Sequence, residues 1–252
     1  MIIWLASGNK HKQQELAAIL TGHCVRIPAE AGISNFDPEE TGASFAENAL
    51  IKAKSLHSLL CSGSCAPGLA ANAGSCAPSG LAANARDLSE SPVLADDSGL
   101  CVDFLGGRPG IYSARYYGKD SWNNDGSFRV KAGTEKLKEQ EQNLLLLEEV
   151  ASLQKMEFAK QTSGQSPKKI ACRFVCAMVL LFSPEKFYLV QETLEGEIVS
   201  SAAGIRGSGG FGYDPIVYLP ELGKTVAELS EEEKNRLSHR GKAGRAIAQL
   251  LH

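Results

Sequence analysis

Two adjacent carboxylates, Asp96 and Asp97, follow a short apolar run at residues 92–95. The run predicts a buried strand, and the Ser98-Gly99 pair after the acids predicts a turn that ends it. Carboxylates buried there need a facing cation, which a bound divalent metal and the water it activates would supply. Because successive strand side chains point to opposite faces, only one acid is expected to face a cleft. The alternative is a pair of turn-forming aspartates that cap the strand.

A second place for chemistry is the turn Ser7-Gly8-Asn9, between an expected strand at residues 2–6 and an expected helix at about 10–20. Free N–H groups and the dipole at a helix N-terminus attract phosphate, and Lys10 and Lys12 would add positive charge. The alternative is an ordinary Asn N-cap with solvated lysines. The spacing matches neither a Walker P-loop nor a dinucleotide-binding fingerprint.

Further acids and a lysine surround the next expected helix, which runs from Phe45 to about Leu60. Glu39-Glu40-Thr41-Gly42 places carboxylates near its start, where they are favourable with the helix dipole. Lys52 lies two turns into the helix. It is either a solvated helix lysine or a phosphate ligand.

Two segments in the second half of the chain could contact a ligand. Residues 207–215 combine glycines, which allow close backbone approach, with Phe211 and Tyr213, which could stack on a base. The alternative is a mobile loop whose aromatics pack on the core. Residues 233–242 gather cations around His239. Gly241 and Gly244 predict a break that exposes His239 and Arg240 on a turn, whereas a bare charge run would be a solvated helix face.

The elements that position these residues alternate between strands and helices, which predicts an α/β fold. A capping-box spacing links Ser230 to Glu233 and begins the C-terminal helix. The Ser183-Pro184-Glu185 turn predicts an antiparallel hairpin, so the sheet is expected to be mixed. The other expected elements are strands near 92–97, 99–105, 170–182, 186–194 and 213–218, and a helical stretch at about 125–158.

Composition limits the function classes. The 252 residues are 43% hydrophobic and 22% charged, as in a soluble globular protein with one large domain or two small ones. A net charge of −3 argues against a protein that coats nucleic acid. We expect no membrane span and no signal peptide. Seven cysteines without a Cys-x-x-Cys pair favour a reducing cytoplasm, with a metal or disulfide role for Cys172 and Cys176 as the minor alternative.

One segment repeats itself: residues 64–73 recur, with one extra serine, at 75–85. Two copies are too few for a solenoid, and small residues with Pro and Gly bury little apolar area. Residues 61–91 are therefore expected to form a surface insertion, with partner binding as an alternative.

Taken together, the motifs resemble those of the inosine/xanthosine triphosphate pyrophosphatase family, the Ham1-like enzymes that remove non-canonical purine nucleoside triphosphates. The resemblance runs from residue 2 to about 251 and treats residues 1–252 as a single domain interrupted by the insertion. The stretch 130–170 is longer and more charged than the family pattern. The matching motifs are Ser7-Gly8-Asn9 with Lys12 and Glu15, Glu39 to Gly42, Phe45 to Ala53, Asp96 to Leu100, Leu105 to Tyr116, Gly209 to Pro215, and Ser238 to Gly241.

The resemblance implies an elongated, twisted mixed sheet flanked by helices, with two lobes and a central nucleotide cleft. It implies Mg²⁺-dependent hydrolysis of ITP, dITP and XTP to the monophosphate and pyrophosphate by a homodimer that binds neither nucleic acid nor membrane. Asp97 would be the catalytic carboxylate and a metal ligand, and Glu39 the second metal ligand. The implied substrate-binding residues are Ser7, Gly8, Asn9, Lys10, His11, Lys12, Lys52, Ser98, Phe211, Gly212, Tyr213, Asp214, Lys234, His239 and Arg240.

Two other functions stay open at this point. A related pyrophosphatase could act on other modified nucleotides, such as methylated pyrimidine triphosphates. A non-catalytic nucleotide-binding module could use the repeated insertion to recruit a partner, although intact Asp97, Glu39 and Lys52 argue against a decayed site.

Overall fold

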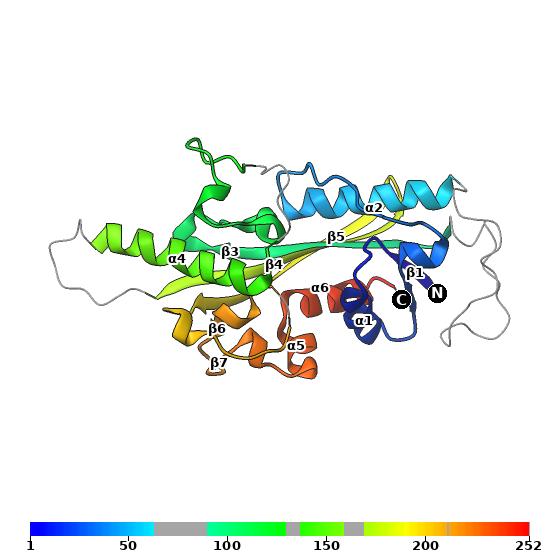
Figure 1. Ribbon diagram of the computed structural model, residues 1–252. Coiled ribbons are helices and arrows are strands. Elements are labelled where there is room, and N and C mark those ends of the chain that lie inside the picture. Colours follow the sequence, from blue (N-terminus) through cyan, green and yellow to red (C-terminus); the bar gives the residue numbers. More distant parts are fainter. Residues whose placement is uncertain (63–89, 130–136, 159–168, 211, 252) are drawn as a thin grey trace. The chain divides into compact units, whose positions relative to one another are not determined.

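A computed structural model describes residues 1–62, 90–129, 137–158, 169–210 and 212–251 (Figure 1). Strands and helices alternate along the first half of the chain, as expected of an α/β fold. The strands are β1 (Ile2–Leu5), β2 (Cys24–Arg26), β3 (Val93–Val102), β4 (Ile170–Ser183), β5 (Lys186–Ile198), β6 (Val217–Leu219) and β7 (Lys224–Thr225). The α-helices are α1 (Lys10–Ile19), α2 (Phe45–Cys61), α4 (Glu139–Phe158), α5 (Glu231–Leu237) and α6 (His239–Ala248).

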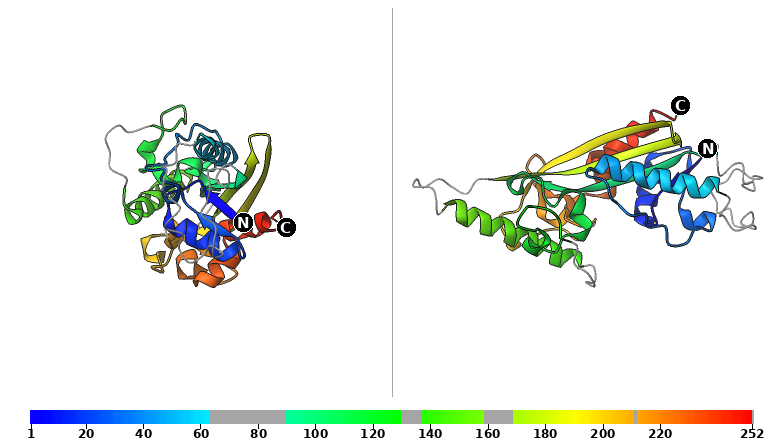
Figure 2. Two further views of the ribbon diagram at one scale, coloured as in Figure 1. Left: turned by 90° about the vertical axis from the view of Figure 1, so that its right-hand side faces the viewer. Right: turned by 90° about the horizontal axis from the view of Figure 1, so that it is seen from above.

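The described strands form one mixed sheet in the order β2-β1-β3-β4-β5-β6-β7. β1 pairs in parallel with both β2 and β3, because a helix-containing crossover links each pair along the chain. β6 is antiparallel to β5 and β7. β4 and β5 are joined at Pro184-Glu185 and run side by side as the expected hairpin (Figure 2). The predicted mixed α/β fold is therefore confirmed.

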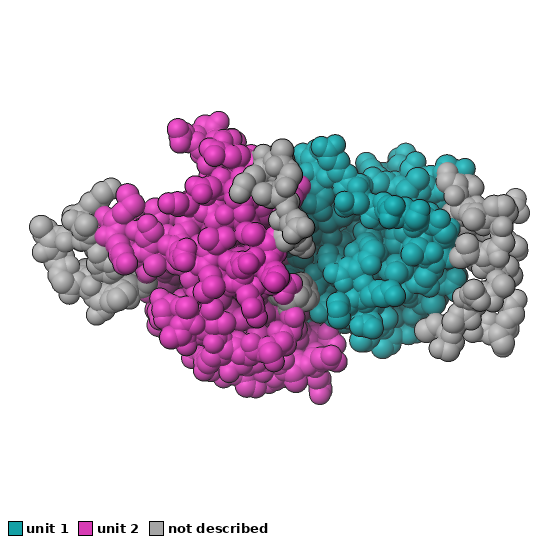
Figure 3. All heavy atoms as spheres, viewed as in Figure 1, with its two compact units in different colours: residues 1–98, 176–192, 239–252 teal, residues 99–175, 193–238 magenta. Residues whose placement is uncertain are grey.

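The chain divides into two compact units, coloured separately in Figure 3. Unit 1 comprises residues 1–98, 176–192 and 239–252, and unit 2 comprises residues 99–175 and 193–238. Unit 2 has one apolar core, in which α4 packs on the strand segments of that unit.

Unit 1 has three layers. On one sheet face, α2 packs against Val93 and Ala95. On the other, α1 and α6 pack against Leu94 (Figure 1). The period-two alternation of β3 thus assigns each of its residues to a layer. Among the described helices, none is long and apolar enough to cross a membrane.

Helix starts follow the capping residues of the sequence. Asn9 caps α1 through its side-chain oxygen, which accepts hydrogen bonds from the N–H groups of His11 and Lys12. Ser44 caps α2 in the same way. Ser230 and Glu233 form the expected capping box at α5. These caps set where the helices that carry the polar residues begin.

Two expected chain breaks are wrong. β3 continues through Ser98-Gly99 to Val102 as one strand. Glycine is needed at position 99 for close packing, because a Cβ there would collide with the Gly110 carbonyl and lie 2.5 Å from Ser113 Oγ. The expected pair of strands at 92–97 and 99–105 is therefore a single element.

The C-terminal break lies at Ser238, before His239. Gly241 and Gly244 are inside α6, and a Cβ at Gly244 would lie 3.1 Å from Ile19 of α1. Packing against α1 explains this glycine. The expected exposure of His239 and Arg240 on a turn is wrong, because they are only 7% and 3% exposed.

Other expectations are refined. The helix expected at 125–158 begins at Glu139, and the strand expected near 213–218 is β6. Cys172 and Cys176 are buried free thiols on β4. The repeated segment within 61–91 lies mostly outside the described residues and stays a prediction, as does the single-domain assignment.

Candidate active site

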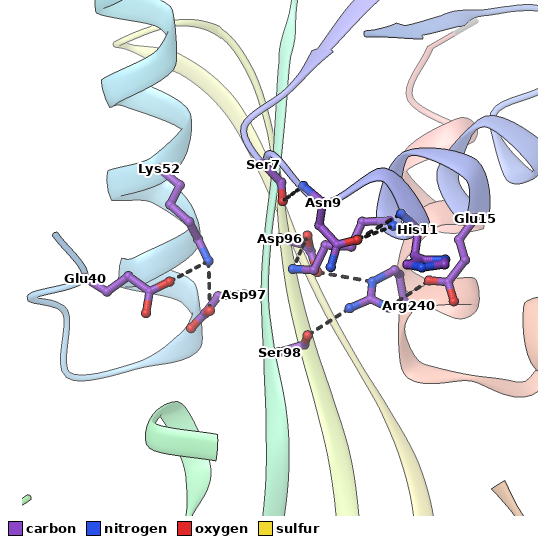
Figure 4. A network of polar contacts seen from close by, with 11 residues as sticks. Ser7, Asn9, His11, Glu15, Glu40, Lys52, Asp96, Asp97, Ser98 and Arg240 are labelled. Carbon is purple, nitrogen blue, oxygen red and sulfur yellow. Dashed lines mark hydrogen bonds and ion pairs between the residues drawn. The ribbon is translucent and has the colours of Figure 1, made fainter. Parts of the chain in front are cut away.

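Asp97 forms a charged cluster with Lys52 and Glu40 in unit 1 (Figure 4). Lys52 Nζ lies 2.9 Å from Asp97 Oδ1 and 3.1 Å from Glu40 Oε1. Lys52 projects from α2 and is 9% exposed, so it is not the solvated helix lysine of the alternative interpretation. Two carboxylates therefore contact the same ammonium group.

Burial changes the proton affinity of this cluster. It raises the pKa of Asp97 above the ordinary aspartate value, and the opposing attraction of Lys52 only partly offsets that effect. Burial alone would lower the pKa of Lys52, but the attraction of the contacting Asp97 carboxylate and of the nearby Asp96 carboxylate raises it. Lys52 is therefore a fixed cation, and Asp97 binds a proton more readily than a solvated aspartate.

Asn48 joins this cluster from one turn earlier on α2. Its side-chain nitrogen donates to Asp97 Oδ2 at 3.3 Å, and its side-chain oxygen accepts from the Gly42 N–H at 2.9 Å. The side chain is fully buried. Sequence reasoning gave Asn48 no role. Its position four residues before Lys52, on the same helix face, was a signal for one.

Asp96 lies on the other side of β3 in a second cluster (Figure 4). Lys12 Nζ contacts its two carboxylate oxygens at 2.9 and 3.0 Å, and Arg240 Nε contacts Oδ2 at 3.2 Å. Burial would raise the pKa of Asp96, but Lys12 and Arg240 hold it well below its usual range. The expectation that the two acids point to opposite faces is confirmed.

Arg240 connects Asp96 to two more residues. Its Nη1 donates to Glu15 Oε2 at 2.8 Å and its Nη2 to Ser98 Oγ at 3.1 Å. Glu15 belongs to the matching motifs but was given no role from sequence. In this cluster, Asp96 and Glu15 contact the cations of Lys12 and Arg240.

The expected phosphate turn begins α1 in the same unit. Ser7 Oγ accepts from the Asn9 N–H at 3.2 Å, so Ser7 and Asn9 order the turn itself (Figure 4). Gly8, Lys10 and His11 are exposed. Lys12 reaches back to Asp96 and is not one of the solvated lysines of the alternative interpretation.

The residues within 207–215 that are expected to contact the nucleotide base lie in unit 2. Tyr213 and Asp214 are 4% and 3% exposed. The Tyr213 hydroxyl donates to the Ser113 carbonyl at 2.9 Å, and Lys234 Nζ pairs with Asp214 at 2.5 Å. The Gly212 carbonyl accepts from the side chain of Asn143. Phe211 lies outside the described residues.

The donor set is compatible with Mg²⁺. In the described part of the chain, no group of three or more His, Cys, Asp or Glu side chains gathers around one point. Mg²⁺ commonly uses only one or two carboxylates together with substrate phosphates. Asp97 and Glu40 supply two hard carboxylate donors that contact the same lysine. Glu39 is exposed, whereas Glu40 is half-buried against Lys52.

Comparison with known proteins agrees with the motifs. The Ham1 family model matches residues 3–250. The chain is 39% identical over 251 residues to a dITP/XTP pyrophosphatase of Treponema denticola, covering 100% of this chain and 98% of the relative. A dITP/XTP pyrophosphatase of Pseudomonas aeruginosa is 38% identical over 247 residues, 98% of this chain and 95% of the relative.

Solved structures support the same relationship. A HAM1 protein from Coxiella burnetii superposes with a TM-score of 0.66 at 29% identity, covering 100% of this chain and 98% of that one. Because motifs, sequence and fold agree over almost the entire length, the chain belongs to the Ham1 family.

Proposed function

We propose that this chain hydrolyses ITP, dITP and XTP to the nucleoside monophosphate and pyrophosphate with Mg²⁺. The observation that carries the proposal is the sharing of Lys52 by Asp97 and Glu40, which brings two carboxylates to one ammonium group. Such a site favours a divalent cation. End-to-end similarity to enzymes named dITP/XTP pyrophosphatase supports the substrate class.

The reaction joins a water oxygen to the α-phosphorus and breaks its bond to the α–β bridging oxygen. Pyrophosphate leaves with the electron pair, and Asp97 accepts the proton of the attacking water. The raised pKa of Asp97 suits that role. Bound Mg²⁺ would neutralise phosphate charge at Asp97 and Glu40. Lys52 and the N-terminus of α1 would hold phosphate oxygens, since phosphoryl transfer depends mostly on positioning and charge neutralisation.

The second metal carboxylate is Glu40 in this proposal, with Glu39 as the alternative. Glu40 contacts the lysine that contacts Asp97, and its side chain is 28% exposed. A carboxylate that binds the same metal ion as Asp97 must lie close to Asp97, as Glu40 does. Exposed Glu39 would be left to solvent.

Preference for a 6-oxo purine requires hydrogen-bond donors facing O6. A 6-amino group would then meet donor with donor, and unpaired buried polar groups can give discrimination on the order of 10⁴. Tyr213, Asp214 and Lys234 of unit 2 remain residues proposed for the base side. The lysine ammonium and the tyrosine hydroxyl among them are hydrogen-bond donors.

A substrate panel with pyrophosphate detection tests the proposal. ITP, dITP and XTP should be turned over with a kcat/KM about 100-fold or more above that of ATP, whose 6-amino group meets donor with donor. Faster turnover of 5-methyl-dCTP would instead favour the modified-nucleotide alternative. Binding of ITP with Mg²⁺ but without pyrophosphate release would favour the binding module.

We also propose that the chain forms a homodimer through the edge of β5. Phe187, Tyr188 and Leu189 are 39%, 43% and 43% exposed. β6 pairs with β5 only at Glu197 and Ile198, so the described sheet leaves the edge at residues 186–192 open. An exposed apolar edge strand is a template for another strand.

The sequence of this edge is complementary to itself. Antiparallel pairing of two copies centred on Leu189 would place Lys186 of each copy opposite Glu192 of the other. Opposite charges facing across strands stabilise such a pair, and a two-fold dimer repeats the contact. This complementarity selects a second copy as the occupant.

A further inference from the structure

We infer that Asn48 is a positioning residue that sets the orientation of the Asp97 carboxylate relative to the segment that carries Glu40. The inference rests on the proposed function, because it assumes that these two acids act together. It concerns a side chain that the proposed chemistry leaves without a role. Asn48 would touch neither substrate nor metal and would act through Asp97.

Both oxygens of Asp97 are held from α2. Lys52 contacts Oδ1 at 2.9 Å, and Asn48 contacts Oδ2 at 3.3 Å. Lys52 and Asn48 lie one helical turn apart, so they project from the same face of α2. Two contacts on different oxygens fix the rotation of a carboxylate, which a single ion pair does not.

The oxygen of the Asn48 amide contacts the segment that precedes α2. Its Oδ1 accepts from the Gly42 N–H at 2.9 Å. Gly42 lies two residues after Glu40. A Cβ on Gly42 would lie 2.7 Å from Asn48 Oδ1 and 2.7 Å from Glu47 Cβ, so only glycine allows this approach.

The role requires a side chain with one donor and one acceptor on a short stem. Asparagine supplies both, leucine of similar size supplies neither, and aspartate supplies only the acceptor. Aspartate would also bring a third carboxylate toward Asp97 and Glu40. A fully buried asparagine is stable here because both ends are paired.

The test compares Asn48→Leu and Asn48→Asp with the wild-type chain, using Mn²⁺ as a probe. Mn²⁺ binding without nucleotide is measured by electron paramagnetic resonance, and kcat and KM for ITP are measured at saturating Mg²⁺. Loss of an outer partner of a metal ligand typically costs 10–100-fold in affinity or activity. Asn48→Leu should weaken Mn²⁺ binding and lower kcat by that factor. Asn48→Asp should lower kcat at least tenfold while KM changes little.

Ser44→Ala is the matched control. It removes the N-cap of the same helix without touching Asp97, so it should lower thermal stability and leave Mn²⁺ binding and kcat near wild type. Folding of every variant is checked by circular dichroism. Should Asn48→Leu misfold, Asn48→Asp decides alone, because it keeps the acceptor for Gly42.

The outcomes separate this inference from the proposed function. If the wild-type chain hydrolyses ITP and both Asn48 variants match its kcat and its affinity for Mn²⁺, the positioning role alone is overturned. Equal losses in the Ser44 control would overturn it as well, by showing that helix stability is the cause. A wild-type chain that releases no pyrophosphate would reject the proposed function instead.

Discussion

Asp96 and Asp97 are neighbours in the chain, yet their carboxyl groups have opposite pKa shifts. Asp96 faces α1 and α6 and is neutralised by Lys12 and Arg240, which lower its pKa. Asp97 faces α2, where burial outweighs the attraction of Lys52 and raises its pKa. Neighbouring side chains of a strand point to opposite faces of the sheet. The charge of Asp96 is therefore stabilised by its cations, whereas the charge of Asp97 is destabilised by burial.

Replacing each aspartate by asparagine should separate stability from catalysis. Asp96→Asn leaves Lys12 and the buried Arg240 without their shared partner, so the free energy of unfolding should fall by about 3–5 kcal/mol. Asp97→Asn should leave the free energy of unfolding within about 1 kcal/mol of wild type and lower kcat by about 10²–10⁴-fold. Urea denaturation and pyrophosphate release measure the two quantities on the same samples.

Each variant is the control for the other because volume and strand position match. An unfolded Asp97→Asn, or one with near-normal turnover, would contradict the role proposed for Asp97. A fully stable Asp96→Asn would mean that its ion pairs add nothing to the fold.

The placement of these acids could be predicted from sequence because it depends on strand periodicity alone. An apolar run fixes the strand, and the period of two sends neighbours to opposite faces. Which acid meets which cation could not be predicted in this way. The partners Lys12, Lys52 and Arg240 come from three helices far apart in the chain, so only the tertiary fold brings them to β3.

Glu39 and Glu40 offer a direct test of the second metal carboxylate. Glu40→Gln should raise the half-saturating Mg²⁺ concentration by at least tenfold, since it removes a carboxylate beside Asp97. Glu39→Gln makes the same substitution at the exposed neighbouring residue, and its half-saturating Mg²⁺ concentration should stay within about twofold of the wild-type value. Titration of activity with Mg²⁺ measures both, and the reverse order would restore Glu39 as the ligand.

Glycine was the least reliable guide in the sequence. Gly99 predicted a turn and Gly241 a helix break, yet both lie inside regular elements. Close packing requires glycine at position 99, and that requirement depends on Gly110 and Ser113, more than ten residues away. Local patterns contain no information about such contacts, whereas the caps Asn9, Ser44 and Ser230 depend on neighbouring residues and mark the helix starts.

A lysine on the edge of β5 should prevent dimer formation. In the proposed pairing, Leu189→Lys would set two lysines directly opposite each other, which is destabilising. Leu222→Lys is the matched control, because Leu222 is also 43% exposed but does not belong to β5. Sedimentation velocity should give a dimer for the control and a monomer for Leu189→Lys. A monomeric wild type would reject the dimer, and a dimeric Leu189→Lys would move its interface elsewhere.

The capping interaction of Glu228 should contribute stability that depends on pH. Its Oε2 accepts from the Thr225 N–H at 2.7 Å, and this hydrogen bond lowers the pKa of Glu228 below the ordinary glutamate value. A lowered carboxyl pKa contributes stability above the unfolded-state value of about 4.3, which is lost as the pH falls through the folded-state value. Glu228→Gln should therefore be less stable than wild type at pH 7, and the difference should shrink below about pH 4. Urea denaturation at both pH values measures this difference. A difference that persists unchanged at low pH would show that the charge of Glu228 does not contribute.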